Sequence, residues 1–243
     1  MAQSSRTKPR RKAGAGVFRR IFQLSALVGL IAVVYAAWFW FEMRSWRPDQ
    51  EVYPEQGAVV PAGASAVRFE TLKAIGASLV YLELAAEGTQ SDPGLRDRIQ
   101  AASAAGLKVG VVQSFDPCQR ADPQSALFTR MVARDLSMLP PAIALIKIPS
   151  SCEPKVSDAA VTSEILTFVN QIELHTGQPV ILKVGEAFET RFAVSSVLDR
   201  DLWLVRDRLR PRYTPRPWLL WTANGQLISE AADEPLEWVV VQQ

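Results

Sequence analysis

Residues 21–41 form an unbroken stretch without a charged side chain, and the 20 residues before it contain seven basic residues and no acidic one. At a rise of about 1.5 Å per residue, a helix over this stretch can cross the hydrocarbon core of a bilayer, which is about 30 Å thick. Basic residues favour the cytoplasmic side, and the aromatic residues at 38–41 suit the far interface. We therefore predict a basic cytoplasmic stub at 1–20, one transmembrane helix at 21–43 and an exported remainder.

A cleaved signal peptide is the alternative to a retained anchor, because it also combines a basic start with an apolar middle. Its apolar region would be shorter and would be followed by a small-residue cleavage site. Here bulky aromatic residues and then Glu42, Met43 and Arg44 follow the small pair at 36–37. The sequence therefore favours a single-pass inner-membrane protein with a cytoplasmic N-terminus and a periplasmic globular domain.

The net charge of the exported part differs from that of the whole chain. The full sequence carries +2, and residues 1–20 contribute +7, so residues 21–243 carry 20 basic and 25 acidic residues, or −5. A mildly acidic domain does not suit a nucleic-acid surface, and we expect no nucleic-acid partner. The basic stub suits anionic lipid headgroups.

The two cysteines, Cys118 and Cys152, would both lie in an oxidising compartment after export. A disulfide is the default there, and two buried free thiols are the alternative. Closing this loop would stabilise the fold by about 3 to 4 kcal/mol. The only histidine, His175, is distant in sequence and ends a predicted helix. We therefore expect no metal site, and we expect no cofactor because phosphate-binding glycine motifs are absent from the sequence.

After a linker at residues 44–56 that is rich in Pro and Gly, the chain alternates between strand-like and helix-like segments. Strands are predicted at 79–84, 107–112, 142–148, 179–184, 201–205, 218–222 and 236–241. Helices are predicted at 67–75, 95–105, 123–137 and 158–175, and a loop at 88–94. This alternation predicts an α/β domain at 57–243 with a mostly parallel sheet that is closed or nearly closed.

Several short motifs occur in the order seen in glycoside hydrolase family 25 lysozymes. They are Ala-Glu-Gly-Thr at 86–89 with Asp92-Pro93 after it, Gly-Leu-Lys-Val-Gly at 106–110, Leu-Pro-Pro-Ala at 139–142, His-Thr-Gly-Gln-Pro-Val-Ile at 175–181, Asp-Leu-Trp-Leu at 201–204 and Pro-Trp-Leu-Leu-Trp at 217–221. Over about residues 53–243 the chain resembles a divergent proteobacterial member of this family. The resemblance implies an irregular TIM-like β/α barrel that binds peptidoglycan at the strand C-terminal ends and cleaves after N-acetylmuramic acid.

The resemblance also implies where the catalytic carboxylates would lie. The family supplies them from an Asp-x-Glu on one strand, an Asp near the domain start and an Asp in the last strand, and a Tyr and a His follow the second strand. In this chain the matching positions, apart from the last Asp, hold residues without acidic chemistry: Ala144, Ile146, Val59, Val112 and Gln113. Only the last aspartate has an acidic counterpart, Glu237.

Three glutamates remain as weak candidates for relocated acids: Glu83, Glu87 and Glu237. A general acid works only within hydrogen-bond reach of the scissile oxygen, which a relocated side chain would have to meet by chance. Trp221, in the family's penultimate-strand motif, is expected to contact the substrate. We therefore predict a degenerate lysozyme-like domain that binds peptidoglycan glycan or a cell-envelope protein. The alternative is an active muramidase with relocated carboxylates.

Five arginines occur within residues 206–216, together with several prolines. Such a run is most often a solvated loop. Outside the membrane it would also suit anionic lipid or the acidic stem peptides of peptidoglycan.

Overall fold

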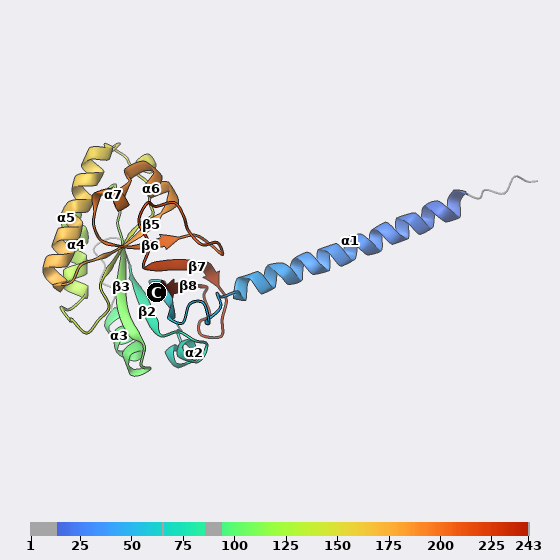
Figure 1. Ribbon diagram of the computed structural model, residues 1–243, viewed down its shortest axis with the longest axis horizontal. Helices are drawn as coiled ribbons and strands as arrows, with labels where there is room; N and C mark the ends of the chain where they lie inside the picture. Colours follow the sequence, from blue (N-terminus) through green and yellow to red (C-terminus); the bar gives the residue numbers. More distant parts are fainter. Residues whose placement is uncertain (1–13, 65, 86–93, 243) are drawn as a thin grey trace, which may run out of the picture. The chain divides into compact units, whose positions relative to one another are not determined.

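The computed structural model describes residues 14–64, 66–85 and 94–242, which belong to two compact units divided between Arg44 and Ser45 (Figure 1). The first unit is built on the helix α1 (Gly14–Ser45), which extends past both ends of the predicted span. Its residues 22–45 are long and apolar enough to cross a membrane, with a mean hydropathy of 2.1 over the most apolar window. These residues are largely exposed.

The second unit is a barrel that closes, within the described residues, from eight strands in chain order. The strands are β1 (Gln56–Val60), β2 (Leu79–Leu84), β3 (Lys108–Ser114), β4 (Ala142–Leu145), β5 (Ile181–Gly185), β6 (Asp201–Val205), β7 (Leu220–Leu227) and β8 (Leu236–Val241). Neighbouring strands from β1 to β7 are parallel, and β8 pairs antiparallel with both β7 and β1. The predicted closed, mostly parallel sheet is therefore confirmed.

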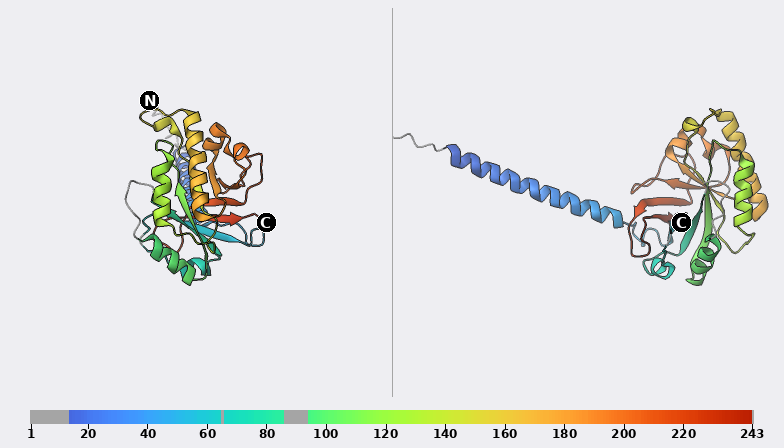
Figure 2. Two further views of the ribbon diagram at one scale, coloured as in Figure 1. Left: turned by 90° about the vertical axis from the view of Figure 1, so that its left-hand side faces the viewer. Right: turned by 180° about the vertical axis from the view of Figure 1, so that it is seen from behind.

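Helices cover the outside of the barrel. They are α2 (Phe69–Ala74), α3 (Leu95–Ala104), α4 (Ala121–Met131), α5 (Asp158–Thr176), α6 (Glu186–Phe192) and α7 (Val194–Val197), with a 3₁₀ turn, η1 (Pro149–Ser151). Figure 2 shows α4 and α5 side by side along one flank. The Ser157 hydroxyl caps the start of α5, and Gly177 ends the helix with a φ of 75°, the left-handed conformation expected of a C-terminal glycine.

Apolar side chains fill two layers, one between the sheet and the helices and one inside the barrel. Alternate residues of each strand point to opposite faces, so Ala58 and Val60 join the outer layer whereas Val59 points inward. The inner cluster consists of Val59, Leu79, Tyr81, Val112, Ala142, Ala144, Ile181, Trp203, Leu220 and Val239. All of these are at most 4% exposed, so the barrel centre is a packed core.

Two sequence-based boundaries differ from the structure. The segment expected as a linker belongs to the domain, because the Trp46 carbonyl accepts a hydrogen bond from Asn224 and the Gln56 side chain bonds the Pro48 and Tyr53 carbonyls. β1 was not predicted as a strand because its five residues directly follow this Pro-rich segment. The helix expected at 123–137 stops at Met131, because Val132 adopts an extended conformation.

Candidate functional site

The C-terminal ends of the parallel strands meet at one rim of the barrel, where enzymes of this architecture place their chemistry. Strand register determines which residues face each other there. Val59 on β1 lies opposite Glu237 on β8, while Ala144 on β4 lies beside Lys183 on β5. The register therefore brings Glu237 to the same rim as Val59 and Ala144, two positions where the resemblance predicts acids.

An ion pair spans the rim between β5 and β8. The Lys183 ammonium lies 2.6 Å from Oε2 of Glu237, and the lysine side chain is 7% exposed. The same Glu237 oxygen accepts a hydrogen bond of 3.2 Å from the Thr222 hydroxyl, which accepts one of 2.9 Å from the Trp203 indole. The ammonium also lies 4.8 Å from the centre of the Trp203 ring, a cation–π contact. The buried polar groups of this network therefore all have partners.

Four of the five substituted positions lie on β3 or at β4, and the other, Val59, lies on β1. Val59, Val112 and Ala144 point into the barrel and are 1 to 4% exposed. Ile146 follows β4 and is 46% exposed. Gln113 points the other way, and its amide donates a 3.0 Å hydrogen bond to the Gln124 carbonyl in the outer layer. Val59, Val112 and Ala144 thus place apolar side chains inside the barrel at three positions where the resemblance predicts polar or acidic ones.

The three candidate glutamates have different surroundings. Glu83, near the end of β2, accepts a 3.3 Å hydrogen bond from Ser114 at the end of β3. Glu237 is held by Lys183 and Thr222. Glu87 lies outside the described residues. The structure thus brings Glu83 and Glu237 to the same rim.

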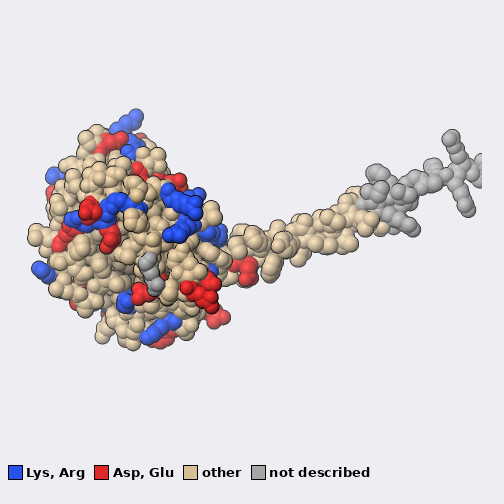
Figure 3. Space-filling view, viewed as in Figure 1, with Lys and Arg blue, Asp and Glu red and all other residues tan. Residues whose placement is uncertain are grey.

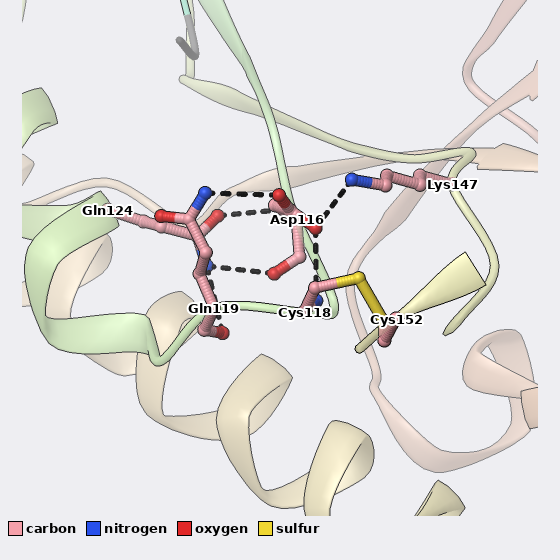
Figure 4. Close-up of a disulfide and its surroundings, with 6 residues drawn as sticks. All are labelled: Asp116, Cys118, Gln119, Gln124, Lys147 and Cys152. Atoms are coloured by element: carbon pink, nitrogen blue, oxygen red, sulfur yellow. Dashed lines mark hydrogen bonds and ion pairs between the residues drawn. A yellow bond between two sulfur atoms is a disulfide. The ribbon is translucent and has the colours of Figure 1, made fainter. Parts of the chain in front are cut away.

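A second lysine–carboxylate pair, which the sequence did not reveal, lies beside the disulfide (Figure 4). Cys118 and Cys152 are joined, as predicted, and the Lys147 ammonium is 2.9 Å from Asp116. Burial raises the pKa of Asp116, but hydrogen bonds from the Cys118 amide, Lys147 and Gln119 outweigh this effect and leave its pKa below the usual range. Asp116 is therefore ionised at neutral pH and cannot serve as a proton donor.

Trp221 lies in a different place from that expected of a substrate contact. Its ring is 4% exposed and packs in the outer layer, edge-on to Trp218 and Tyr53. Its indole N–H donates a 2.7 Å hydrogen bond to the Arg206 carbonyl. The side chain therefore supports the loop after β6 and presents no free face to a sugar.

His175 has a structural environment. Its Nε2 donates a 2.8 Å hydrogen bond to the Val132 carbonyl, and its ring meets Phe128 edge to face. α5 ends just before β5 begins, so His175 lies toward the N-terminal end of the strands, opposite the rim. Among residues 14–64, 66–85 and 94–242, three or more His, Cys, Asp or Glu side chains nowhere gather as metal ligands would.

One sequence signal could have identified the Lys183 network. Lys183 is the single charged residue of β5, whose other described positions are buried or half-buried. A lysine in such a strand must find a partner, because an unpaired buried charge is costly. By contrast, the pairing of Asp116 with Lys147 depends on the geometry of two loops.

Comparison with known proteins agrees with the geometry. The sequence model described as glycosyl hydrolases family 25 matches residues 60–226, more than half of the chain. A family 25 glycosyl hydrolase from Bacillus anthracis superposes with a TM-score of 0.69 at 18% identity, covering 82% of this chain and 93% of that one.

Two further solved structures have the same fold. A bacterial lysozyme from Streptomyces coelicolor gives a TM-score of 0.67 at 16% identity, covering 78% of this chain and 92% of that one. A family 25 lysozyme from Aspergillus fumigatus gives 0.65 at 19% identity, covering 78% and 94%. The comparison with curated protein sequences returns no significant match.

Proposed function

This chain belongs to glycosyl hydrolase family 25, and we propose that it is a member that binds peptidoglycan without cleaving it. The observation that carries the proposal is the composition of the rim. Where the family has its Asp-x-Glu, this chain has Ala144 and Ile146, and Val59 replaces the early aspartate. The pattern lacks three carboxylates at two separate places in the chain. A single misplaced gap in the alignment with the family would not account for all three.

The reaction itself explains why these losses matter. Glycoside hydrolysis requires a carboxylic acid that protonates the leaving oxygen and, in most families, a second carboxylate that acts on the sugar carbon or on water. Two carboxylates near these strand ends, Glu237 and Asp116, are paired with lysines. A further one, Glu83, accepts a hydrogen bond from Ser114. This arrangement supports a rim that recognises a ligand and performs no proton transfer.

Two features of the chain bear on where the barrel domain lies: the helix α1 and the disulfide. The apolar helix, either a signal or an anchor, and the Cys118–Cys152 bond indicate an extracytoplasmic domain. We propose a retained anchor in the inner membrane, with residues 1–20 in the cytoplasm and the barrel in the periplasm. Peptidoglycan would then be the polymer within reach, and a cell-envelope protein is the second partner class.

The test uses residues 45–243, which form a compact unit with their own closed barrel and core. This domain is incubated with purified sacculi, and both pelleting and new reducing ends are followed beside an active family 25 lysozyme. We expect pelleting without release of reducing ends. Sustained turnover that is abolished by Glu83→Gln or Glu237→Gln would overturn the proposal and establish the relocated-acid muramidase.

A second arm of the same experiment addresses the ligand. Pelleting should fall when soluble muropeptides compete for the domain. A domain that stays in the supernatant with sacculi would exclude glycan binding and leave the cell-envelope protein as the partner.

A further inference from the structure

The loop between β6 and β7 concentrates positive charge in an otherwise acidic domain. Residues 206–216 contain five arginines and one aspartate, whereas residues 21–243 together carry −5. Figure 3 shows basic side chains gathered on the face of the domain over β6 and β7. A local cationic surface on an anionic protein attracts anionic partners over a short range.

The arginine loop, residues 206–216, is held in one conformation by its own hydrogen bonds. The Tyr213 hydroxyl accepts one of 2.8 Å from the Val205 amide and donates one of 2.6 Å to the Val184 carbonyl. At the far end of the loop, Arg216 donates to the Leu198 and Arg200 carbonyls at 2.8 and 3.1 Å. Arg216 is thus a structural residue. Of the other four arginines, Arg210 and Arg212 are exposed, and the Arg210 guanidinium lies 5.6 Å from the centre of the Trp218 ring.

The tip of the arginine loop combines cations with an exposed apolar side chain. Leu209 is 60% exposed and lies between Arg208 and Arg210, and Arg212 follows one proline later. Arg208 pairs with Asp207. In the part of the chain that the structure describes, Arg206 and Arg212 have no carboxylate partner within 4.0 Å. Guanidinium groups bind phosphate strongly, and an exposed leucine among them suits a membrane interface.

The base of the arginine loop is tied to the point where the chain enters the domain. The Arg208 amide donates a 2.7 Å hydrogen bond to the Ala223 carbonyl on β7. One residue later on β7, the Asn224 amide group donates a 2.9 Å hydrogen bond to the Trp46 carbonyl. The uncharged stretch ends at residue 41, and five residues span at most about 18 Å. An anchored chain would therefore keep Trp46, and with it the loop base, close to the bilayer.

We propose that the arginine loop binds anionic phospholipid headgroups of the membrane that the chain is anchored in, and so holds the barrel against the bilayer surface. The proposal rests on the retained anchor proposed above. Lipid is favoured over the acidic stem peptides of peptidoglycan because of the tether at Trp46 and because Leu209 offers an apolar contact that a soluble peptide does not need. The cations would bind the lipid phosphates, and the leucine would enter the interface.

The test removes the anchor so that only the loop contributes. Residues 45–243 are mixed with vesicles of phosphatidylcholine alone or with 30% phosphatidylglycerol, and pelleting is measured at low and physiological salt. We expect binding to the anionic vesicles only, weakened by salt. Replacing both Arg210 and Arg212 with Gln should lower the affinity by at least about tenfold, because each cation near the surface contributes appreciably.

The matched control is Arg120→Gln together with Lys108→Gln, which removes the same charge from two exposed side chains elsewhere. We expect this variant to bind anionic vesicles within about twofold of the unmodified domain. A Leu209→Trp variant supplies a direct reading, because its fluorescence should shift to the blue with anionic vesicles. Three results would each overturn the proposal. They are equal binding to both vesicle types, a loss of affinity in the control variant equal to that of the double arginine variant, and an unchanged fluorescence of Leu209→Trp with anionic vesicles.

Two further measurements distinguish this proposal from the others. If the double arginine variant no longer pellets with sacculi but still binds vesicles, the loop binds stem peptides and the lipid assignment is wrong. Protease accessibility of the full chain in membranes reports separately on the anchor. If the domain binds anionic vesicles but the helix is cleaved from the full chain, the loop binds lipid as proposed and the retained anchor is wrong.

Discussion

Lys183 donates to Glu237 across the rim of the barrel at 2.6 Å, beneath which the interior is almost wholly apolar. The two residues are 54 positions apart in the sequence. Ala144, which pairs with Lys183 in the sheet, and Val59, which pairs with Glu237, carry no charge. Glu237 supplies the carboxylate that the buried Lys183 requires as a partner. The pair is therefore expected to stabilise the barrel.

Replacing Lys183 with Met tests this role. The substitution leaves Glu237 without its cation, and a third of that side chain is exposed, so we expect a loss of about 1 to 3 kcal/mol, less than for a fully buried pair. Urea unfolding at pH 7 measures the change. The control is Lys108→Met, which breaks the exposed pair with Glu55 and should cost less than about 1 kcal/mol. Equal effects of the two substitutions would contradict a structural role for Lys183.

The ionisation of Asp116 should make the free energy of unfolding depend on pH. Its pKa in the folded domain lies below the usual value, because hydrogen bonds from the Cys118 amide, Lys147 and Gln119 outweigh burial. A depressed folded pKa stabilises above the unfolded pKa of about 4, and that contribution is lost as pH falls through the folded value. Asp116→Asn should therefore destabilise by about 1 kcal/mol at pH 7, and the difference should shrink toward pH 3.

The measurement is the urea midpoint of both proteins between pH 7 and pH 3. Asp201→Asn, at an exposed position on β6, serves as the control and should leave the difference near zero at every pH. A constant deficit for Asp116→Asn over the whole range would show that the carboxylate does not titrate as proposed.

Much of the barrel could be predicted because its strands are short apolar runs separated by helices with clear ends, as at Gly177. β1 escaped prediction because its five residues directly follow a segment rich in proline. The positions proposed to have lost their acids, Ala144, Ile146 and Val59, come from the order of the motifs and stay a prediction. The partners Lys183 and Lys147 could not be predicted, because strand register and loop closure, rather than local sequence, bring them to Glu237 and Asp116.

The Cys118–Cys152 bond joins cysteines 34 positions apart and closes a segment that contains α4 and β4. Replacing both cysteines with Ser should lower the free energy of unfolding by about 3 to 4 kcal/mol, because the unfolded chain regains the entropy of the open loop. Denaturant unfolding with and without a thiol reductant measures this. Reductant should destabilise the unmodified domain by a similar amount and leave the serine variant unchanged. Indifference of the unmodified domain would mean that the bond does not form in solution.

Gly110 on β3 should tolerate no side chain. A Cβ atom there would overlap the ring of Tyr81, which is 1% exposed inside the barrel and donates a 3.1 Å hydrogen bond to the Pro140 carbonyl. The ring cannot move aside without losing that bond and displacing the packed interior. Gly110→Ala should therefore lower the free energy of unfolding by about 1 to 3 kcal/mol, as overpacking does in cores.

Gly225→Ala is the control, since nothing lies within 4 Å of its Cβ position, and it should change stability by less than about 0.5 kcal/mol. If thermal unfolding shows both variants equally stable, the close approach of Tyr81 to β3 is not what requires a glycine there.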